Sequence, residues 1–241
     1  MESLPPHELS RLEAIAGPEQ SLDELVRRRV GGEPLQYIEG TAMFGPIELV
    51  VDERVLVPRP ETEGLFDMAS RMVRNPEVIV DLCTGSGALA LALKHSFPGA
   101  SVFATEVSPD ALEVAIINKQ RSGLDIYLTE GDLFDPLPAS LLGEVDLIVA
   151  NPPYVAVAEV PSLPRDVQRE PHIALVSGPT GLEAIQRIGA SAAEWLRPGG
   201  VVVCEIGETQ AVSATSSFTN LPAVVRQDLA GRDRYVVAVK P

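Results

Sequence analysis

The sequence predicts an α/β protein built around a mostly parallel β-sheet with helices on both faces. From residue 78 onward, short apolar segments alternate with helical segments of about ten or more residues, which is the pattern of βαβ units. Several apolar segments, such as "LIVA" at 147–150 and "VVVC" at 201–204, are uninterrupted. Unbroken runs of this kind are typical of strands that are buried on both faces of a parallel sheet.

Smaller elements are expected before this repeating part. The first thirty residues are predicted to be helical, with Ser21 and Glu24 as a capping box, until "VGGEP" breaks the helix. Residues 41–57 are predicted to form a small β-hairpin around Gly45-Pro46 and then a second extended piece. Pro60 is expected to open the next helix, because proline fits the first helical position.

The repeating part is expected to supply six strands and three helices. The expected strands span 78–82, 101–106, 125–130, 144–150, 201–206 and 234–240, and the expected helices span 88–97, 109–121 and 181–196. A long irregular segment separates the fourth of these strands from the last helix. In sheets of this kind, ligands bind at the carboxyl ends of the strands, so candidate site residues are expected there.

The acidic composition argues against nucleic-acid partners, and the lack of a long apolar run argues against a membrane span. The chain has 241 residues, with 19 Lys+Arg against 34 Asp+Glu and a net charge of −15. Non-specific affinity for nucleic acid comes mostly from basic residues that neutralise phosphates, and the tight basic cluster at 27–29 is expected to be a solvated helix face. No stretch approaches about 18 uninterrupted apolar residues. We therefore expect no membrane span and no direct binding of nucleic acid.

The cysteines and histidines predict neither a disulfide nor a metal site. Cys83 and Cys204 each adjoin an apolar run and are expected to be reduced thiols. His7, His95 and His172 form no pattern with each other or with the cysteines, so no metal is predicted. The N-terminus lacks the long apolar run of a signal peptide, and a cytoplasmic location is expected.

A glycine turn after the strand at 78–82 is the first candidate for a ligand site. In "DLCTGSGALA", Gly85 and Gly87 let the backbone approach a ligand and leave the N-terminal amides of a helix free. The turn is not the G-x-G-x-x-G fingerprint of dinucleotide-binding proteins, and taken alone it is a weak signal.

Two acidic residues follow the next two strands. Glu106 can accept both ribose hydroxyls of a nucleoside, although it can also be an ordinary acid at a helix N-terminus. Asp132 can accept a hydrogen bond from an adenine amine while Leu133 covers the ring, although "EGDLFDPL" can also be a plain acidic loop. The glycine turn, Glu106 and Asp132, in this order, indicate S-adenosylmethionine rather than a dinucleotide, and the chain has no P-loop pattern.

The stretch "DLIVANPPYV" ends a predicted strand with an asparagine, two prolines and a tyrosine. Pro152 moves Asn151 out of the α region and removes a backbone donor. A planar NH2 group placed here can donate one hydrogen to the Asn151 side-chain oxygen and the other to the Pro152 carbonyl, and Tyr154 can stack on its face. Such acceptors favour a nitrogen that becomes pyramidal and positive during methyl transfer. The alternative is a plain Asn-Pro turn.

These segments resemble the HemK/PrmC family, the protein-(glutamine-N5) methyltransferases that modify peptide chain release factors. The match runs from about Arg28 to the C-terminus and includes "RRVGGEPLQYIEG", "VLVPRPETE", "DLCTGSGALALALK", "GDLFDPL", "DLIVANPPYV" and "LRPGGVVVCEIGETQ". Amino-methylating DNA and RNA enzymes also carry "NPPY", whereas "VLVPRPETE" points to the glutamine branch. The resemblance implies a Rossmann-like domain of seven strands, S-adenosyl-L-methionine as cofactor, and a glutamine in a Gly-Gly-Gln loop as substrate.

The motifs and the resemblance together imply roles for individual residues. Cofactor contacts are expected from Cys83, Thr84, Gly85, Ser86, Gly87, Glu106, Asp132, Leu133 and Asn151. Catalytic roles are expected for Asn151, Pro152 and Tyr154, and the substrate glutamine is expected to contact these three residues and Pro153. Arg59 and Glu61 are expected to buttress the cofactor side.

The expected organisation has three parts. They are a short N-terminal helical segment (1–32), a β-hairpin linker with a connecting helix (33–70), and an S-adenosylmethionine-dependent methyltransferase domain (71–241). The leading hypothesis is methyl transfer to the amide of a protein glutamine in a release factor. The alternatives are transfer to an exocyclic amine of adenine or guanine in DNA or RNA, and a non-catalytic protein that binds the cofactor.

Overall fold

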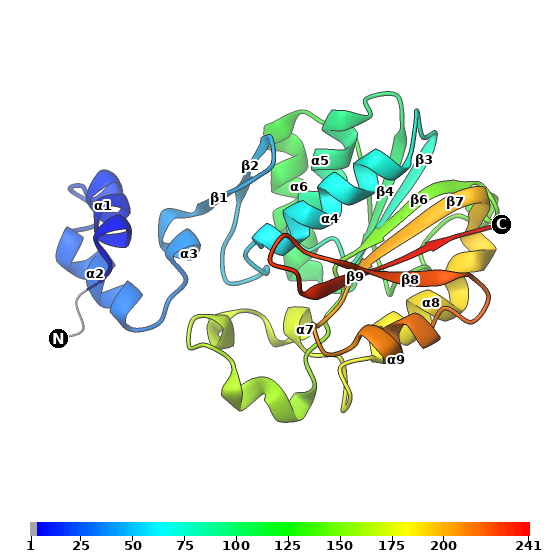
Figure 1. Ribbon diagram of the computed structural model, residues 1–241. Coiled ribbons are helices and arrows are strands. Elements are labelled where there is room, and N and C mark those ends of the chain that lie inside the picture. The colour runs from blue at the N-terminus through cyan, green and yellow to red at the C-terminus, as the bar shows by residue number, and fades with distance from the viewer. Residues whose placement is uncertain (1–3) are drawn as a thin grey trace.

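The computed structural model describes residues 4–241 and has a seven-stranded sheet at its centre, in the order β5-β4-β3-β6-β7-β9-β8 (Figure 1). Its strands are β3 (Val78–Leu82), β4 (Ser101–Glu106), β5 (Tyr127–Glu130), β6 (Val145–Ala150), β7 (Leu196–Glu205), β8 (Ala223–Gln227) and β9 (Asp233–Val239). The strands from β5 to β7 pair in parallel, while β9 is antiparallel to both of its neighbours. The predicted α/β class and the seven strands implied by the resemblance are confirmed.

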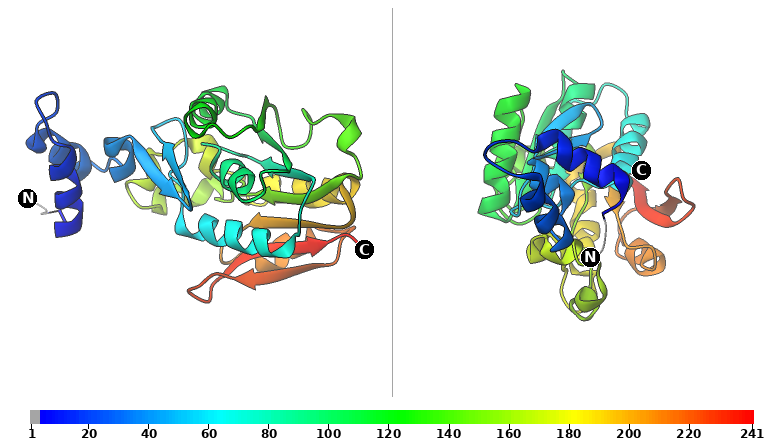
Figure 2. Two further views of the ribbon diagram at one scale, coloured as in Figure 1. Left: turned by 90° about the horizontal axis from the view of Figure 1, so that it is seen from above. Right: turned by 90° about the vertical axis from the view of Figure 1, so that its left-hand side faces the viewer.

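Helices cover both faces of the sheet (Figures 1 and 2). One face carries α4 (Pro60–Met72), α5 (Ala88–Ser96) and α6 (Pro109–Ser122), and the other carries α8 (Glu183–Trp195) and α9 (Ala211–Ser216). Successive residues of a strand point to opposite faces. Val201 and Val203 accordingly pack into the core on the side of α4, α5 and α6, while Val202 and Cys204 pack into the core on the side of α8 and α9. Burial on both faces explains why the central strands are unbroken apolar runs.

The N-terminal helices form a small cluster of their own. α1 (Pro6–Ile15), α2 (Leu22–Val30) and α3 (Leu35–Glu39) bury Leu12, Leu25, Leu35 and Ile38 against one another. In Figures 1 and 2 these helices lie apart from the sheet. The prediction that the first thirty residues are helical is wrong for the break around Gly17 and Pro18, which separates α1 from α2, and residues 1–3 lie outside the described part of the chain. Ser21 is the N-cap of α2, and its hydroxyl accepts from the Glu24 backbone N–H at 3.3 Å.

The predicted hairpin is present and is fastened to the glycine turn. It consists of β1 (Thr41–Phe44) and β2 (Ile47–Val50). Asn118 of α6 is 1% exposed, and its Nδ2 donates to the carbonyls of Val50 at 3.0 Å and Ser86 at 2.9 Å. Its Oδ1 accepts from the Val50 N–H at 2.7 Å. One buried amide therefore holds the hairpin against the loop that follows β3.

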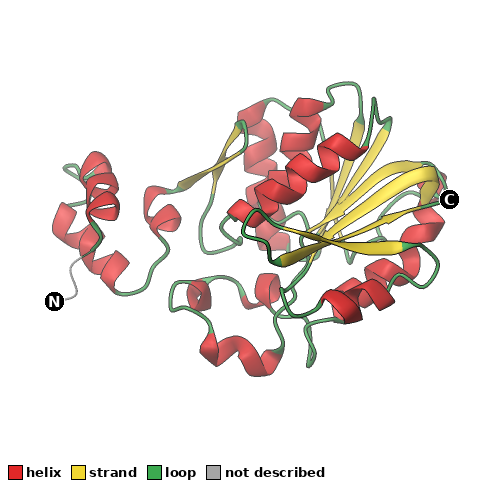
Figure 3. Ribbon diagram, viewed as in Figure 1, coloured by secondary structure: helices red, strands yellow, loops and turns green. Residues whose placement is uncertain are grey.

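The sequence pattern missed β8, α3 and α9. β8 lies at the sheet edge and most of its residues are exposed, so no buried apolar run marks it. With 5 and 6 residues, α3 and α9 are too short for a helical period to be recognised. The long irregular segment after β6 is confirmed as mostly loop, interrupted by α7 (His172–Leu175) and 3₁₀ turns (Figure 3). Of the helices within residues 4–241, none combines the length and the apolar character that crossing a bilayer requires.

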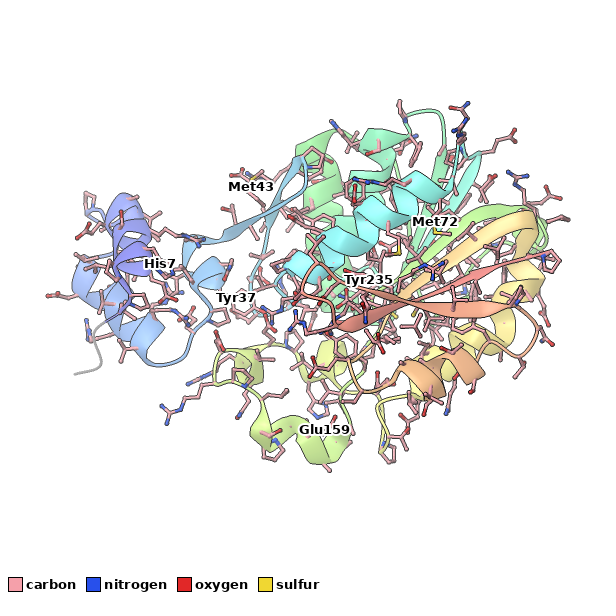
Figure 4. All side chains as sticks on the ribbon, viewed as in Figure 1. His7, Tyr37, Met43, Met72, Glu159 and Tyr235 are labelled. Carbon is pink, nitrogen blue, oxygen red and sulfur yellow. The ribbon has the colours of Figure 1, made fainter. Side chains whose placement is uncertain are left out.

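Gly64 of α4 lies close to the side chain of Tyr235 of β9, which is labelled in Figure 4. This contact leads to a prediction about stability. The Tyr235 side chain is buried, its hydroxyl donates to the Glu61 carbonyl at 2.7 Å, and a Cβ added at Gly64 would overlap the hydroxyl oxygen. Helix propensity alone favours alanine by about 0.5–1 kcal/mol. We nevertheless expect Gly64→Ala to lower the free energy of unfolding by about 1–3 kcal/mol, because a packed core resists added volume. Urea denaturation measures this difference.

The matched control is the same change in a Tyr235→Phe background. That background lacks the overlapping oxygen, so Gly64→Ala is expected to be neutral or stabilising there. An equal loss of stability in both backgrounds would contradict the packing argument.

Candidate active site

Two cavities meet at Asn151, where the chain leaves the sheet after β6. Their volumes are about 270 Å³ for the first cavity and about 340 Å³ for the second. Leu56, Asn151 and Ala174 line both cavities. The Asn151 side chain therefore stands on the wall between two spaces, each of a size suited to part of a ligand.

The glycine turn forms the floor of the first cavity. Gly85 and Gly87 have φ values of +57° and +84°, and a Cβ added at Gly85 would meet no atom within 4 Å. The lack of a side chain at Gly85 thus leaves open space at the cavity. Asp81 holds this turn in place, because its Oδ2 accepts from the Thr84 hydroxyl at 2.5 Å and from the Ala90 N–H at 3.1 Å. Burial raises the pKa of Asp81 to about 7.

Glu106 ends β4 at the wall of the first cavity and is 8% exposed. Its Oε2 accepts from the Gly85 N–H at 2.9 Å, and its Oε1 accepts from the Ser108 N–H at 3.0 Å. Burial raises the pKa of this carboxyl above its ordinary value. Each carboxylate oxygen has two lone-pair sites, so both oxygens keep the capacity to accept a further hydrogen bond from a diol.

The structure brings nearly all the predicted cofactor residues to the first cavity. Lining residues are Cys83, Thr84, Gly85, Ser86, Glu106, Asp132, Leu133 and Asn151. Gly87 lies behind the wall as the N-cap of α5, where an added Cβ would approach Leu91 and Ala115. Asp132 accepts from the Arg187 guanidinium at 2.7 Å, and Arg187 lines the same cavity.

The residues of "NPPY" alternate between the two cavities. Pro153 lines the first cavity, whereas Pro152 and Tyr154 line the second. The Tyr154 carbonyl accepts from the Gln210 amide at 2.8 Å, which fixes the path of the chain just beyond the prolines. Only Asn151 of the four residues borders both spaces.

Arg59 and Glu61 line the second cavity rather than the first. Arg59 and Glu61 thus lie apart from most of the residues expected to contact the cofactor, and their expected role on the cofactor side stays a prediction. The reason is that Arg59 pairs with the buried Glu170 of the irregular segment, which also accepts from the Val57 N–H at 3.1 Å. This pairing directs Arg59 to the side of Asn151 that faces the irregular segment.

A buried hydrogen-bonded chain below Asn151 was not found from the sequence. Asn151 Nδ2 donates to the Thr62 hydroxyl oxygen at 3.0 Å, and the Thr62 hydroxyl donates to Glu205 Oε2 at 2.9 Å. The Tyr154 hydroxyl donates to Glu205 Oε1 at 3.3 Å. The sequence did carry a signal for Glu205. It is an acid at the carboxyl end of a buried strand, β7, just as Glu106 is at the end of β4. Thr62, inside a helix, carries no comparable signal.

The second cavity also has a cationic wall that the sequence analysis missed. Arg234 of β9 is 8% exposed and donates through Nη1 to the Ile206 carbonyl at 3.2 Å. Among the described residues its buried Nε finds no hydrogen-bond partner. Three or more His, Cys, Asp or Glu side chains do not gather as a metal-binding group anywhere in residues 4–241.

The family model described as "Methyltransferase small domain" matches residues 65–164. Related sequences named release factor glutamine methyltransferase come from Mycolicibacterium smegmatis and Moorella thermoacetica. The first is 42% identical over 226 residues, which are 91% of this chain and 79% of the relative. The second is 39% identical over 247 residues, which are 98% of this chain and 86% of the relative.

Two solved structures are similar in fold. A methyltransferase from Pyrococcus furiosus superposes with a TM-score of 0.61 at 19% identity, covering 90% of this chain and 95% of that chain. The 16S rRNA N2 G1207 methyltransferase of T. Thermophilus, in complex with AdoMet and guanosine, superposes with a TM-score of 0.58 at 20% identity, covering 83% of this chain and 50% of that chain. At these identities the likeness concerns the fold alone.

The Arg59–Glu170 pair generates a pH-dependent stability prediction. Burial raises the pKa of Glu170 from an ordinary value of 4.5 to about 7, against the opposing effect of Arg59. Folding stability from this carboxyl is therefore lost as pH rises from about 4.5 through about 7. Without Arg59 the pKa of Glu170 rises further, so the loss of folding stability continues to higher pH. Arg59→Met is thus expected to cost more stability at pH 8 than at pH 6.

We expect the cost at pH 8 to be about 2–3 kcal/mol, below the ~3–5 kcal/mol of fully buried pairs, since the Arg59 side chain is 31% exposed. Denaturant unfolding at the two pH values measures it. The control is Arg59→Met combined with Glu170→Gln, which should abolish the difference between the pH values. If the single variant loses the same stability at pH 6 and at pH 8, Arg59 does not stabilise the ionised form of Glu170.

Proposed function

This chain belongs to the family of release factor glutamine methyltransferases, and we propose that it methylates the side-chain amide nitrogen of the Gly-Gly-Gln glutamine in a peptide chain release factor. The methyl donor in this proposal is S-adenosyl-L-methionine. The observation that carries the proposal is the position of Asn151, at the wall between the two cavities. A donor in one cavity and a glutamine side chain in the other would meet there.

The first cavity suits S-adenosyl-L-methionine. Glu106 offers a carboxylate to the two ribose hydroxyls, and the open space at Gly85 leaves room for the part of the molecule that crosses the glycine turn. Leu133 offers an apolar surface to a flat ring, and it is 7% exposed. When bound, this group supplies a methyl carbon made electrophilic by a positive sulfur.

The second cavity suits a glutamine on a glycine-rich loop. Its wall combines apolar side chains such as Leu163 and Val167 with the guanidinium groups of Arg59 and Arg234. Guanidinium groups can donate to the backbone carbonyls that glycines leave accessible. Pro152 and Tyr154 line the same cavity, within reach of a side chain that approaches Asn151.

Asn151 and Pro152 can hold the substrate amide in a reactive geometry. The Asn151 Oδ1 and the Pro152 carbonyl accept one hydrogen each from the substrate NH2, while the Tyr154 ring lies against its plane. The new N–C bond would form as the bond between the methyl carbon and sulfur breaks, which leaves a neutral thioether. The substrate nitrogen would become pyramidal and positive, so these acceptors would stabilise the transition state more than the ground state. The nitrogen would then release one proton to water, and no strong base has to act before the transfer. Positioning of this kind contributes up to about 7–11 kcal/mol in favourable cases.

Methylation of a nucleobase amine is not favoured. The net charge of −15 is unsuited to a phosphate backbone. The similar rRNA methyltransferase shares 20% identity with this chain and so informs only the fold.

A direct test is mass spectrometry of a full-length release factor incubated with this protein and S-adenosyl-L-methionine. We expect one added methyl group on the Gly-Gly-Gln glutamine. Asn151→Ala should slow the transfer by about 10²–10³-fold, the usual effect of removing one group that stabilises the transition state. Methylation at another residue, or a fully active Asn151→Ala variant, would contradict the proposal.

Glu106→Gln tests the proposed ribose contact. An amide offers one acceptor oxygen and no charge, and a hydrogen bond to a charged group contributes about 1.5–3 kcal/mol. We therefore expect the Kd for S-adenosylhomocysteine, measured by calorimetry, to rise by about 10–100-fold. Glu130→Gln is the matched control, because Glu130 pairs with Glu106 in the adjacent strand but is exposed. An equal effect of both changes would point to general electrostatics instead of a ribose contact.

A further inference from the structure

The hydrogen-bonded chain below Asn151 joins three elements of the fold. Thr62 comes from the first turn of α4, Glu205 from the end of β7, and Asn151 from the loop after β6. Thr62 is 5% exposed and Glu205 is 1% exposed. The chain runs from Asn151 Nδ2 to Thr62 Oγ1 at 3.0 Å and from Thr62 Oγ1 to Glu205 Oε2 at 2.9 Å. It is therefore continuous, shielded from water and directed at the side chain between the two cavities.

The protons in this chain dictate which end of the Asn151 amide faces Thr62. An ionised carboxylate can only accept hydrogen bonds. The single hydroxyl proton of Thr62 is consequently given to Glu205, and the Thr62 oxygen presents only lone pairs to Asn151. The NH2 end of the amide must meet those lone pairs, so the carbonyl end is turned away from Thr62. Within residues 4–241, Nδ2 is the atom through which the Asn151 side chain is hydrogen bonded, and Oδ1 is left available to a ligand.

We infer that Thr62 and Glu205 are positioning residues that hold the Asn151 side-chain oxygen toward the substrate amide. This inference rests on the proposed function, because it assigns to Asn151 Oδ1 the role of acceptor for the glutamine NH2. A flipped Asn151 would present its own NH2 to the substrate NH2, and two donors would repel. Glu205 also accepts from the Tyr154 hydroxyl at 3.3 Å, so the same carboxylate orients the ring that lines the second cavity.

We call the hydrogen-bonded chain of Glu205, Thr62 and Asn151 the relay. It holds the Asn151 side-chain oxygen toward the substrate only while Glu205 is ionised. A protonated Glu205 can donate to the Thr62 oxygen, which frees the Thr62 proton for Asn151 Oδ1 and allows the amide to flip. Burial raises the pKa of Glu205 to about 7, while the Thr62 hydrogen bond and Arg234 oppose the increase. Glu205 therefore changes from the protonated to the ionised form near neutral pH.

The charged and titratable groups around Glu205 come from each neighbouring element. Arg234 of β9 favours the carboxylate, and Glu61 of α4 disfavours it. The Tyr154 hydroxyl donates to it, and burial raises the pKa of Tyr154, so that phenol keeps its proton. The phenol of Tyr235 and the thiol of Cys204 stay neutral because burial raises the pKa of each. Glu205 itself is expected to titrate near pH 7, because burial raises its pKa to about 7.

The first test uses transfer rates with the release factor. Thr62→Val keeps the shape of the side chain but removes the hydroxyl, and it should lower kcat by about 10–100-fold, the scale of a misplaced reactive group. Thr62→Ser restores the hydroxyl and should recover most of the activity. Thr62 also lines the first cavity, so kcat is compared at saturating S-adenosyl-L-methionine, where a change in cofactor affinity does not contribute.

The pH profile separates a relay from a merely structural contact. Wild-type kcat should rise with pH through about 7, as Glu205 becomes ionised. Burial also raises the pKa of Asp81 and Glu170 to about 7, so Glu205→Gln should reduce this acid limb and lower the plateau. A Thr62→Val enzyme with wild-type kcat, or a Glu205→Gln enzyme with the wild-type pH profile, would overturn the relay while leaving the methylation assignment intact.

A second readout does not depend on the substrate. In ¹⁵N-labelled protein, the side-chain NH2 resonances of Asn151 should shift with pH, with a midpoint near the pKa of Glu205, about 7. The shift should disappear in both Thr62→Val and Glu205→Gln. Asn151 resonances that do not respond between pH 5.5 and 8.5 would overturn the relay even if the wild-type enzyme proved inactive on release factors. Inactivity of the wild type on release factors would instead contradict the proposed function.

Discussion

Two successive prolines after β6 impose the constraint on which the site depends. Pro152 and Pro153 have no backbone N–H to offer a neighbouring strand, so the chain must leave the sheet directly after Asn151. It leaves between the ends of β3 and β7, the two neighbours of β6. That exit creates one wall with a cavity on each side. A single side chain can then contact a methyl donor and a methyl acceptor that enter from different directions.

Buried carboxyl groups hold this arrangement together. Asp81, Glu106, Glu170 and Glu205 are each at most 8% exposed, and burial raises the pKa of each. Glu106 connects the glycine turn with the end of β4, and Glu170 connects the irregular segment with the extended piece before α4. Asp81 acts locally and holds the glycine turn against the start of α5. Carboxylates in such surroundings lower stability as pH rises. Their accumulation in one region is typical of a functional site rather than of a structural core.

The fold was largely predictable from the sequence, because unbroken apolar strands and glycine turns have local signatures. β8 escaped because an exposed edge strand has none. For the candidate site, residues at the end of a strand or directly after it, such as Glu106 and Asn151, were found. Thr62 and Arg234 were not, because their proximity to Asn151 arises from the packing of α4 and β9 against the sheet. The second cavity could not be predicted for the same reason, since the irregular segment forms part of its wall.

We propose that donor and acceptor occupy separate cavities that meet at Asn151. A crystal structure of the protein with S-adenosylhomocysteine and a Gly-Gly-Gln peptide would test this arrangement. We expect the nucleoside against Glu106 in the first cavity and the glutamine side chain in the second, with its amide nitrogen within hydrogen-bonding distance of Asn151 Oδ1 and the Pro152 carbonyl. A glutamine bound in the first cavity, or an amide nitrogen that contacts Asn151 Nδ2 instead, would contradict it.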